Sequence, residues 1–222
     1  MKWGDRKISS GPTSLTEFAG QMYFTADDGT HGTELWKTDG TADGTTLVKD
    51  ITPGTGDTTF NEMIAVGDTL FFANRNLDDE LWKSDGTESG TVQVKDIEPG
   101  MVGSFPHDLR NVEGQLLFNA FTTAYGNEIW VSDGTEGGTM ITRDINPGPA
   151  DSNPFHITVH NGAIYFEAND GATGPSSPSP GGCAARAPAS ASRPCDATTT
   201  ATVVATARRP RQPRKHRPAR RR

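Results

Sequence analysis

The chain has 222 residues and a formal net charge of −7, but the charge is divided unevenly between two parts. Residues 172–222 hold 11 Lys and Arg and one acidic residue, which leaves 10 basic and 27 acidic residues in residues 1–171. So acidic a surface argues against binding of nucleic acids or anionic membranes, because both are bound largely through Lys and Arg.

The apolar segments and the cysteines narrow the class of protein further. The sequence contains no apolar run of 18 residues for a membrane span, and its first residues lack the apolar segment of a signal peptide. If the protein is exported, we expect its signal to lie outside this chain. Both cysteines, Cys183 and Cys195, fall in the tail, so the remainder contains neither a disulfide framework nor a thiolate metal site.

One motif recurs along the chain. ELWKTDGTADGT begins at Glu34, ELWKSDGTESGT at Glu80 and EIWVSDGTEGGT at Glu128, at intervals of 46 and 48 residues. Such a period is typical of propeller blades. It divides residues 1–171 into units at about 14–59, 60–104 and 105–152, with a partial unit at 153–171. Residues 1–13 match the end of a unit, so we expect the array to begin before Met1.

Within each unit, four short apolar segments alternate with turn residues, which is typical of strands. In the second unit the strands are predicted at about 60–66, 69–74, 79–84 and 91–97. Phe71 adjoins Phe72 and Leu81 adjoins Trp82, and neighbouring strand residues point to opposite faces. Both faces of each sheet must then be buried. The predicted fold is an all-β, β-propeller-like array with three complete four-stranded blades; a linear β solenoid is the alternative.

A tryptophan stands at the same point of each unit, at Trp36, Trp82 and Trp130. Burial of an indole removes roughly 150–250 Å² from water, which at about 25 cal/mol per Å² is on the order of 4–6 kcal/mol before entropy. A tryptophan repeated at this spacing is predicted to be part of the core rather than a ligand platform.

The residues after each tryptophan predict a tight hairpin between the third and fourth strands. Asp can accept backbone hydrogen bonds, and Gly adopts the positive φ that such turns require. The predicted turn residues are Asp39, Gly40, Thr41, Asp85, Gly86, Thr87, Asp133, Gly134 and Thr135. The alternative is a calcium loop, since these oxygens suit a hard cation, but each loop offers few fixed carboxylates. No cofactor is therefore expected, with calcium as the alternative.

The motif resembles the bacterial ELWxxDGT repeat family over about residues 6–171, with Ile129 and Val131 as small departures in the third copy. The resemblance implies a propeller-like repeat module of exported or surface-associated bacterial proteins, and it carries over no catalytic residue. The turn is also loosely similar to the Asp-box of sialidases, although Ser84-Asp85-Gly86-Thr87 is more compact than Ser-x-Asp-x-Gly-x-Thr-Trp.

The sequence offers little evidence for a catalytic or metal-binding site. The four arginines of residues 1–171 lie at unmatched points of the repeat, so they do not predict the arginine cluster of a sialidase-like site. The acids repeated in every unit, such as Glu80 and Asp96, are predicted to be structural. His156 and His160 would lie about 13 Å apart on a strand, too far for one zinc ion. His31 and His107 have no Cys or His nearby and are interpreted as solvated or channel-lining.

After Gly171 the repeat stops, and a Pro/Ala/Arg-rich tail follows at residues 172–222. This composition cannot bury a core and predicts disorder. The tail is interpreted as a segment read out of frame, because it begins where the next ELW motif is due. The alternative is a genuine basic arm that binds nucleic acid or directs nuclear localisation.

Together these features predict a non-enzymatic repeat module of an exported or cell-surface bacterial protein, which binds an unknown protein or glycan through loops. Neither nucleic acid nor a membrane span is expected. Part of a secreted, glycosidase-like propeller hydrolase and a purely structural spacer are the alternatives. An incomplete array leaves apolar blade faces uncovered, which predicts self-association.

Overall fold

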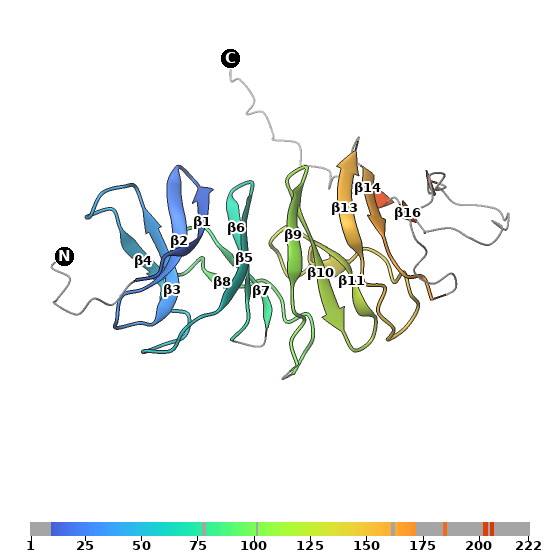
Figure 1. The fold of residues 1–222 in the computed structure, drawn as a ribbon, viewed down its shortest axis with the longest axis horizontal. Coiled ribbons are helices and arrows are strands. Elements are labelled where there is room, and N and C mark those ends of the chain that lie inside the picture. The colour runs from blue at the N-terminus through green and yellow to red at the C-terminus, as the bar shows by residue number, and fades with distance from the viewer. Residues whose placement is uncertain are drawn as a thin grey trace, which may run out of the picture.

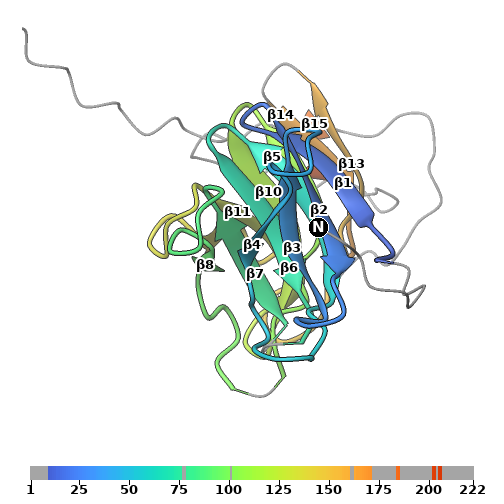
Figure 2. The same ribbon diagram turned by 90° about the vertical axis from the view of Figure 1, so that its left-hand side faces the viewer.

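The computed structural model describes residues 10–76, 79–100, 102–160 and 163–171, with the short segments 184–185, 202–203 and 205–206. Every regular element in this part of the chain is a β-strand. The sheets stand side by side in chain order along the long axis of the molecule (Figure 1). Seen along that row, they overlap face to face (Figure 2). The predicted all-β, propeller-like array of four-stranded blades is confirmed.

Three blades are complete. Blade 1 consists of β1 (Thr13–Phe18), β2 (Gln21–Asp27), β3 (Thr33–Thr38) and β4 (Thr46–Lys49); blade 2 of β5 (Phe60–Val66), β6 (Thr69–Asn74), β7 (Glu80–Ser84) and β8 (Val92–Gln93); and blade 3 of β9 (His107–Val112), β10 (Gln115–Thr122), β11 (Gly126–Ser132) and β12 (Met140–Ile141). Each is an antiparallel sheet whose strands neighbour one another in chain order. The first strands of successive blades also contact each other, β1 with β5 and β5 with β9.

The predicted strands of the second unit agree with β5, β6 and β7, but the predicted fourth strand, 91–97, is too long. Only Val92–Gln93 forms β8. The amide of Val94 still donates to the carbonyl of Leu81 at 2.9 Å, after which the chain leaves the sheet. This departure lets Val94 and Ile97 enter the core between blades, so burial of two apolar side chains prevails over extension of the outer strand.

Both faces of blade 2 are buried, as its paired apolar residues predict. Phe72 belongs to the core shared with blade 1, whereas its neighbour Phe71 belongs to the core shared with blade 3. In β7, Trp82 likewise packs toward blade 1 and Leu81 toward blade 3. Alternation along a strand therefore sends neighbouring side chains into two different cores.

The tryptophans occupy equivalent places but differ in burial. Trp36 and Trp130 are buried, with 7% and 5% of their surfaces exposed. Trp82 is half-buried and stacks on Phe72, with ring centroids 6.3 Å apart. All three indole N–H groups are buried without a hydrogen-bond partner in the described part of the chain. Their contribution is therefore apolar packing.

A partial blade follows blade 3. It contains β13 (Phe155–His160) and β14 (Ala163–Glu167), and β14 also pairs with the two-residue strand β17 (Ala205–Thr206) of the tail. A second pair, β15 (Ala184–Ala185) and β16 (Thr202–Val203), is parallel. These six tail residues lie in strands, and the rest of the tail lies outside the described residues, as does the segment before Ser10. No helix in the described ranges is long and apolar enough to cross a membrane.

We expect the tryptophan substitutions to follow burial. Trp130→Ala should lower the free energy of unfolding by about 3–5 kcal/mol, the usual cost of emptying a buried aromatic site. Trp82→Ala should cost less, because Trp82 is only half-buried. Denaturant titrations followed by circular dichroism measure both, with Met140→Ala on an exposed edge as the control. Equal costs for Trp130 and Met140 would contradict the placement of Trp130 in the core.

Candidate functional site

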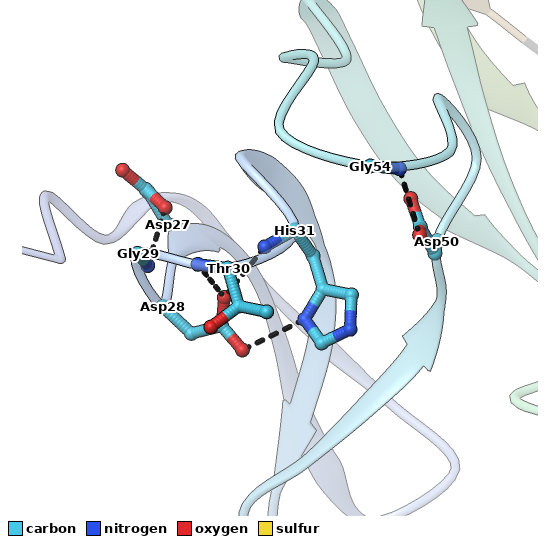
Figure 3. Close-up of polar contacts among 7 residues, drawn as sticks. All are labelled: Asp27, Asp28, Gly29, Thr30, His31, Asp50 and Gly54. Atoms are coloured by element: carbon cyan, nitrogen blue, oxygen red, sulfur yellow. Dashed lines mark hydrogen bonds and ion pairs between the residues drawn. The ribbon is translucent and has the colours of Figure 1, made fainter.

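The loop between β2 and β3 of blade 1 carries a cluster of polar groups that no other blade repeats (Figure 3). Asp28 accepts hydrogen bonds at one carboxylate oxygen from the amides of Thr30 and His31, at 2.8 and 2.9 Å. Its other oxygen lies 2.8 Å from Nδ1 of the His31 ring. Asp27 accepts from the amide of Gly29 at 2.7 Å. The loop thus fixes a carboxylate and an imidazole in one orientation.

Electrostatics favour the charged forms of this pair. The hydrogen bond from the His31 ring to Asp28 raises the pKa of His31; desolvation opposes this shift, and the negative charges of Asp28, Asp50 and Glu34 add smaller effects that also raise the pKa. Burial opposes ionisation of Asp28, but hydrogen bonds from His31 and Thr30 prevail and lower its pKa. The ring faces Asp28, with the Asp50 turn on its other side in the view of Figure 3. An imidazolium held this way can contact an anionic or polar ligand.

The Asp28–His31 pair is not hydrogen-bonded to a nucleophile in the described part of the chain, because no hydroxyl or thiol there contacts the His31 ring. The corresponding loops of the other blades contain Arg75 and Asn76 in blade 2 and Tyr125 in blade 3. The pair can position a proton or a charge, but its contacts with the described residues do not form a catalytic triad.

Neither His107 nor His156 joins this pair. His107 contacts the carbonyl of Phe105 at 2.9 Å, and His156 contacts Glu167 at 3.3 Å. The side chain of His160 lies outside the described ones. No group of three or more His, Cys, Asp or Glu residues suited to a metal ion occurs in the part of the chain that the structure describes.

A buried glutamate lies within the first three residues of the third strand in each complete blade. Glu80 is fully buried, and its carboxylate accepts from the amide of Glu98 at 3.0 Å and from the hydroxyl of Ser104 at 2.6 Å. The equivalent contacts join Glu34 to Ile51, Thr52 and Thr58, and Glu128 to Asn146 and Ser152. Each carboxylate thereby connects a third strand to the segment that leads into the next blade.

The Asp-Gly-Thr motifs lie at the hairpins between the third and fourth strands. In blade 2, Oδ1 of Asp85 accepts from the amide and the hydroxyl of Thr87, at 2.9 and 2.7 Å. The same hydroxyl accepts from the amide of Gly90 at 3.0 Å. Blades 1 and 3 repeat these contacts through Asp39, Thr41 and Gly44 and through Asp133, Thr135 and Gly138. Hydrogen bonds from Thr41 and Thr87 lower the pKa of Asp39 and Asp85.

These turns also join one blade to the next, which the sequence alone did not indicate. Nζ of Lys37 in blade 1 donates to the carbonyl of Gly86 in blade 2 at 2.9 Å, and a Cβ at Gly86 would overlap the hydroxyl of Tyr23. Lys83 makes the equivalent contact with Gly134 of blade 3 at 2.6 Å. The signal available in the sequence was the lysine that follows Trp36 and Trp82.

A cavity of about 250 Å³ opens on the face of blade 1 that points away from blade 2. Its lining is mostly apolar and includes Phe24, Ala26 and Trp36, with Ala42 and Thr45 from the hairpin turn and Asp27 and Asp28 at its edge. It therefore lies between the first Asp-Gly-Thr turn and the Asp28–His31 loop.

Blades, turns and glutamates together define a repeat protein of the propeller-like, all-β class. No family model and no curated protein matches the sequence. Among solved structures, the chain is similar to a crystal structure of a mutant puromycin hydrolase complexed with PGG, with 15% sequence identity and a TM-score of 0.48. The match covers 72% of this chain, which spans about a quarter (25%) of that one.

Stability should depend on pH through the buried glutamates. Burial raises the pKa of Glu34, Glu80 and Glu128, although their hydrogen bonds oppose the shift. A carboxyl with a raised pKa binds its proton more tightly in the folded chain. Its contribution to stability is therefore greatest at a pH below the ordinary pKa of Glu, and it declines as the pH rises through the raised pKa of the folded chain. We expect the melting temperature to increase as the pH falls from 7 toward about 4.3, the ordinary value for Glu.

A single substitution isolates this effect from His31, whose raised pKa acts in the same direction near neutral pH. Glu80→Gln keeps an acceptor for the amide of Glu98 and removes the charge, so it should raise the melting temperature at pH 7 and flatten the pH dependence. Glu80→Ala should destabilise at every pH, because it leaves the buried amide and the Ser104 hydroxyl without a partner. An unchanged pH profile in Glu80→Gln would contradict the argument.

Two adjacent glycines test the hairpin turn. A Cβ at Gly138 would overlap the carboxylate of Asp133, whereas a Cβ at Gly137 meets nothing within 4 Å. We expect Gly138→Ala to cost about 1–3 kcal/mol in the free energy of unfolding. The matched control, Gly137→Ala, should be neutral or stabilising by up to about 1 kcal/mol. Urea titrations distinguish the two, and equal effects would show that the Asp133 contact does not constrain the turn.

Proposed function

We propose that the chain is a non-enzymatic repeat module of an exported or cell-surface bacterial protein, which binds a protein or glycan ligand. The proposed binding surface is the loop face, defined as the loops between second and third strands together with the connections between blades. The cellular location is supported by the resemblance of the ELW and DGT motifs to a family of that kind.

The observation that carries this proposal is the difference between the two ends of the blades. At one end, the Asp-Gly-Thr turns repeat the same residues and the same hydrogen bonds in all three blades. The loop face instead carries side chains that do not repeat, including the Asp28–His31 pair and the exposed aromatic rings of Phe105, Tyr125 and Phe155. Exposed aromatic residues near polar groups suit recognition of proteins or sugars.

The loop face is also well supported by backbone contacts. The amides of Ser104 and Phe105 both donate to the carbonyl of Asp79, at 3.1 and 2.9 Å. The amide of Asn127 donates to the carboxylate of Asp151 at 2.8 Å. Each connection is thereby held against the adjacent loop. A ligand would meet loops whose described residues are already held by backbone hydrogen bonds, which lowers the entropic cost of binding.

Binding should depend on this face. The immobilised chain would be tested on a glycan array and in pull-downs from bacterial envelope extract. We expect specific binding that Tyr125→Ala or His31→Ala weakens tenfold or more, the scale of a binding hot spot. Met140→Ala, an exposed change on the outer strand β12, should leave binding unchanged. Blank results in both assays would contradict a binding role and favour a structural spacer.

A further inference from the structure

The polar loop of blade 1, between β2 and β3, lies against the segment that connects β4 to blade 2. A Cβ at Gly32 in the loop would overlap the carbonyl of Gly56 in the connection, so the two backbones approach without room for a side chain. The amide of Thr33 donates to the carboxylate of Asp57 at 2.7 Å, and its carbonyl accepts from the amide of Thr58 at 2.8 Å. A change of charge in the loop therefore acts directly on the connection.

The imidazole of His31 lies at this contact, among three carboxylates. Asp28, on the same loop, is 2.8 Å from Nδ1 of the ring. Asp50 lies on the connection, on the other side of the ring in the view of Figure 3, and Glu34 is a fully buried residue of β3. The charges of all three act on the ring. Carboxylates from three elements thus lie around one group that can carry a positive charge.

The carboxylate of Asp50 is only partly satisfied by hydrogen bonds. Its Oδ2 accepts from the amide of Gly54 at 3.3 Å, whereas its Oδ1 is buried and has no hydrogen-bond partner among the described residues. Burial of an unpaired carboxylate oxygen is costly, and a positive charge nearby reduces that cost. His31 can supply this charge when its ring is protonated. The other charged residues of the same elements form hydrogen bonds with backbone groups instead: Asp27, Lys37, Lys49 and Asp57.

Blade 3 contains the same contact without a ring that titrates near neutral pH. Tyr125 occupies the place of His31 in the repeat, and a phenol keeps its proton until about pH 10. The amide of Asn127 donates to Asp151 at 2.8 Å, in the same way as the corresponding groups of blade 1. Asp144, on the connection after blade 3, again has a buried Oδ1 with no partner in the described part of the chain. Blade 3 is therefore an internal reference for a loop of constant charge.

We propose that His31 is a pH-sensitive switch of the loop face: the charged ring holds the β2–β3 loop of blade 1 against the connection to blade 2, and loss of its proton releases the loop. When the ring is neutral, Asp28, Glu34 and Asp50 repel one another across the contact, and the backbone contacts alone oppose them. The hydrogen bond to Asp28 raises the pKa of His31. The stabilisation is therefore complete below the ordinary value of about 6.5 and is lost as the pH rises through the raised pKa. The switch does not depend on a loop-face ligand.

Amide hydrogen exchange of the full chain, measured by NMR at about pH 6 and about pH 8, tests the proposal. After correction for the intrinsic exchange rate, protection of the Thr33 and Gly54 amides should fall about tenfold or more at the higher pH, because the loop leaves the connection. The equivalent amides of blade 3, those of Asn127 and Gly148, should keep their protection. A fall of equal size in both blades would indicate a change in overall stability. That result, or no fall in blade 1, would overturn the proposal.

Two variants separate the switch from a purely structural role of the loop. His31→Gln retains a hydrogen-bond donor for Asp28 but cannot become charged, so the protection of Thr33 should be low and equal at both pH values. Asp50→Asn removes the charge on the connection and should lower the pKa of His31, measured by NMR titration of its ring. Asp43→Asn, on the exposed hairpin turn between β3 and β4, is the control and should leave that pKa unchanged. A pKa that Asp50→Asn does not lower would show that the ring responds to its own loop alone, which would also overturn the proposal.

Discussion

Each blade in this array is apolar on both faces, so its stability depends on the blades beside it. A lone four-stranded sheet would expose Phe71 and Leu81 on one face and Phe72 and Trp82 on the other. Burial of these faces is the main favourable term in folding, and it can be realised only between sheets. Array stability is therefore a property of the interfaces between sheets.

Apolar burial has no direction, so it does not by itself determine how one blade sits on the next. Polar contacts at both ends of the sheets supply that geometry. On the loop face, the carboxylate of Glu80 joins the third strand to Glu98 and Ser104 on the path into blade 3. At the opposite end, Lys83 of the same blade reaches the carbonyl of Gly134. A buried carboxylate with hydrogen-bonded partners is costly to disturb, which makes the register specific.

The sequence was sufficient to predict elements whose physics is local or repeated. Adjacent apolar residues such as Phe71 and Phe72 predicted a sheet buried on both faces, and the strands of the second unit lie within a residue of β5, β6 and β7. The fourth strand could not be bounded, because the early departure after Val94 depends on a core between blades. The Asp28–His31 pair could not be predicted from the sequence either, since it occurs only once in the repeats and its geometry depends on the fold of a single loop.

The third copy of the motif shows how the repeat adapts to its neighbour. Val131 stands where Lys37 and Lys83 reach the turn of the following blade, and it packs instead against the core that includes Ile145 and Ile164. At this point of the repeat, Lys37 and Lys83 donate to a carbonyl of the following blade, whereas Val131 packs in an apolar core. The same position can therefore join two blades through a polar or an apolar contact, according to its side chain.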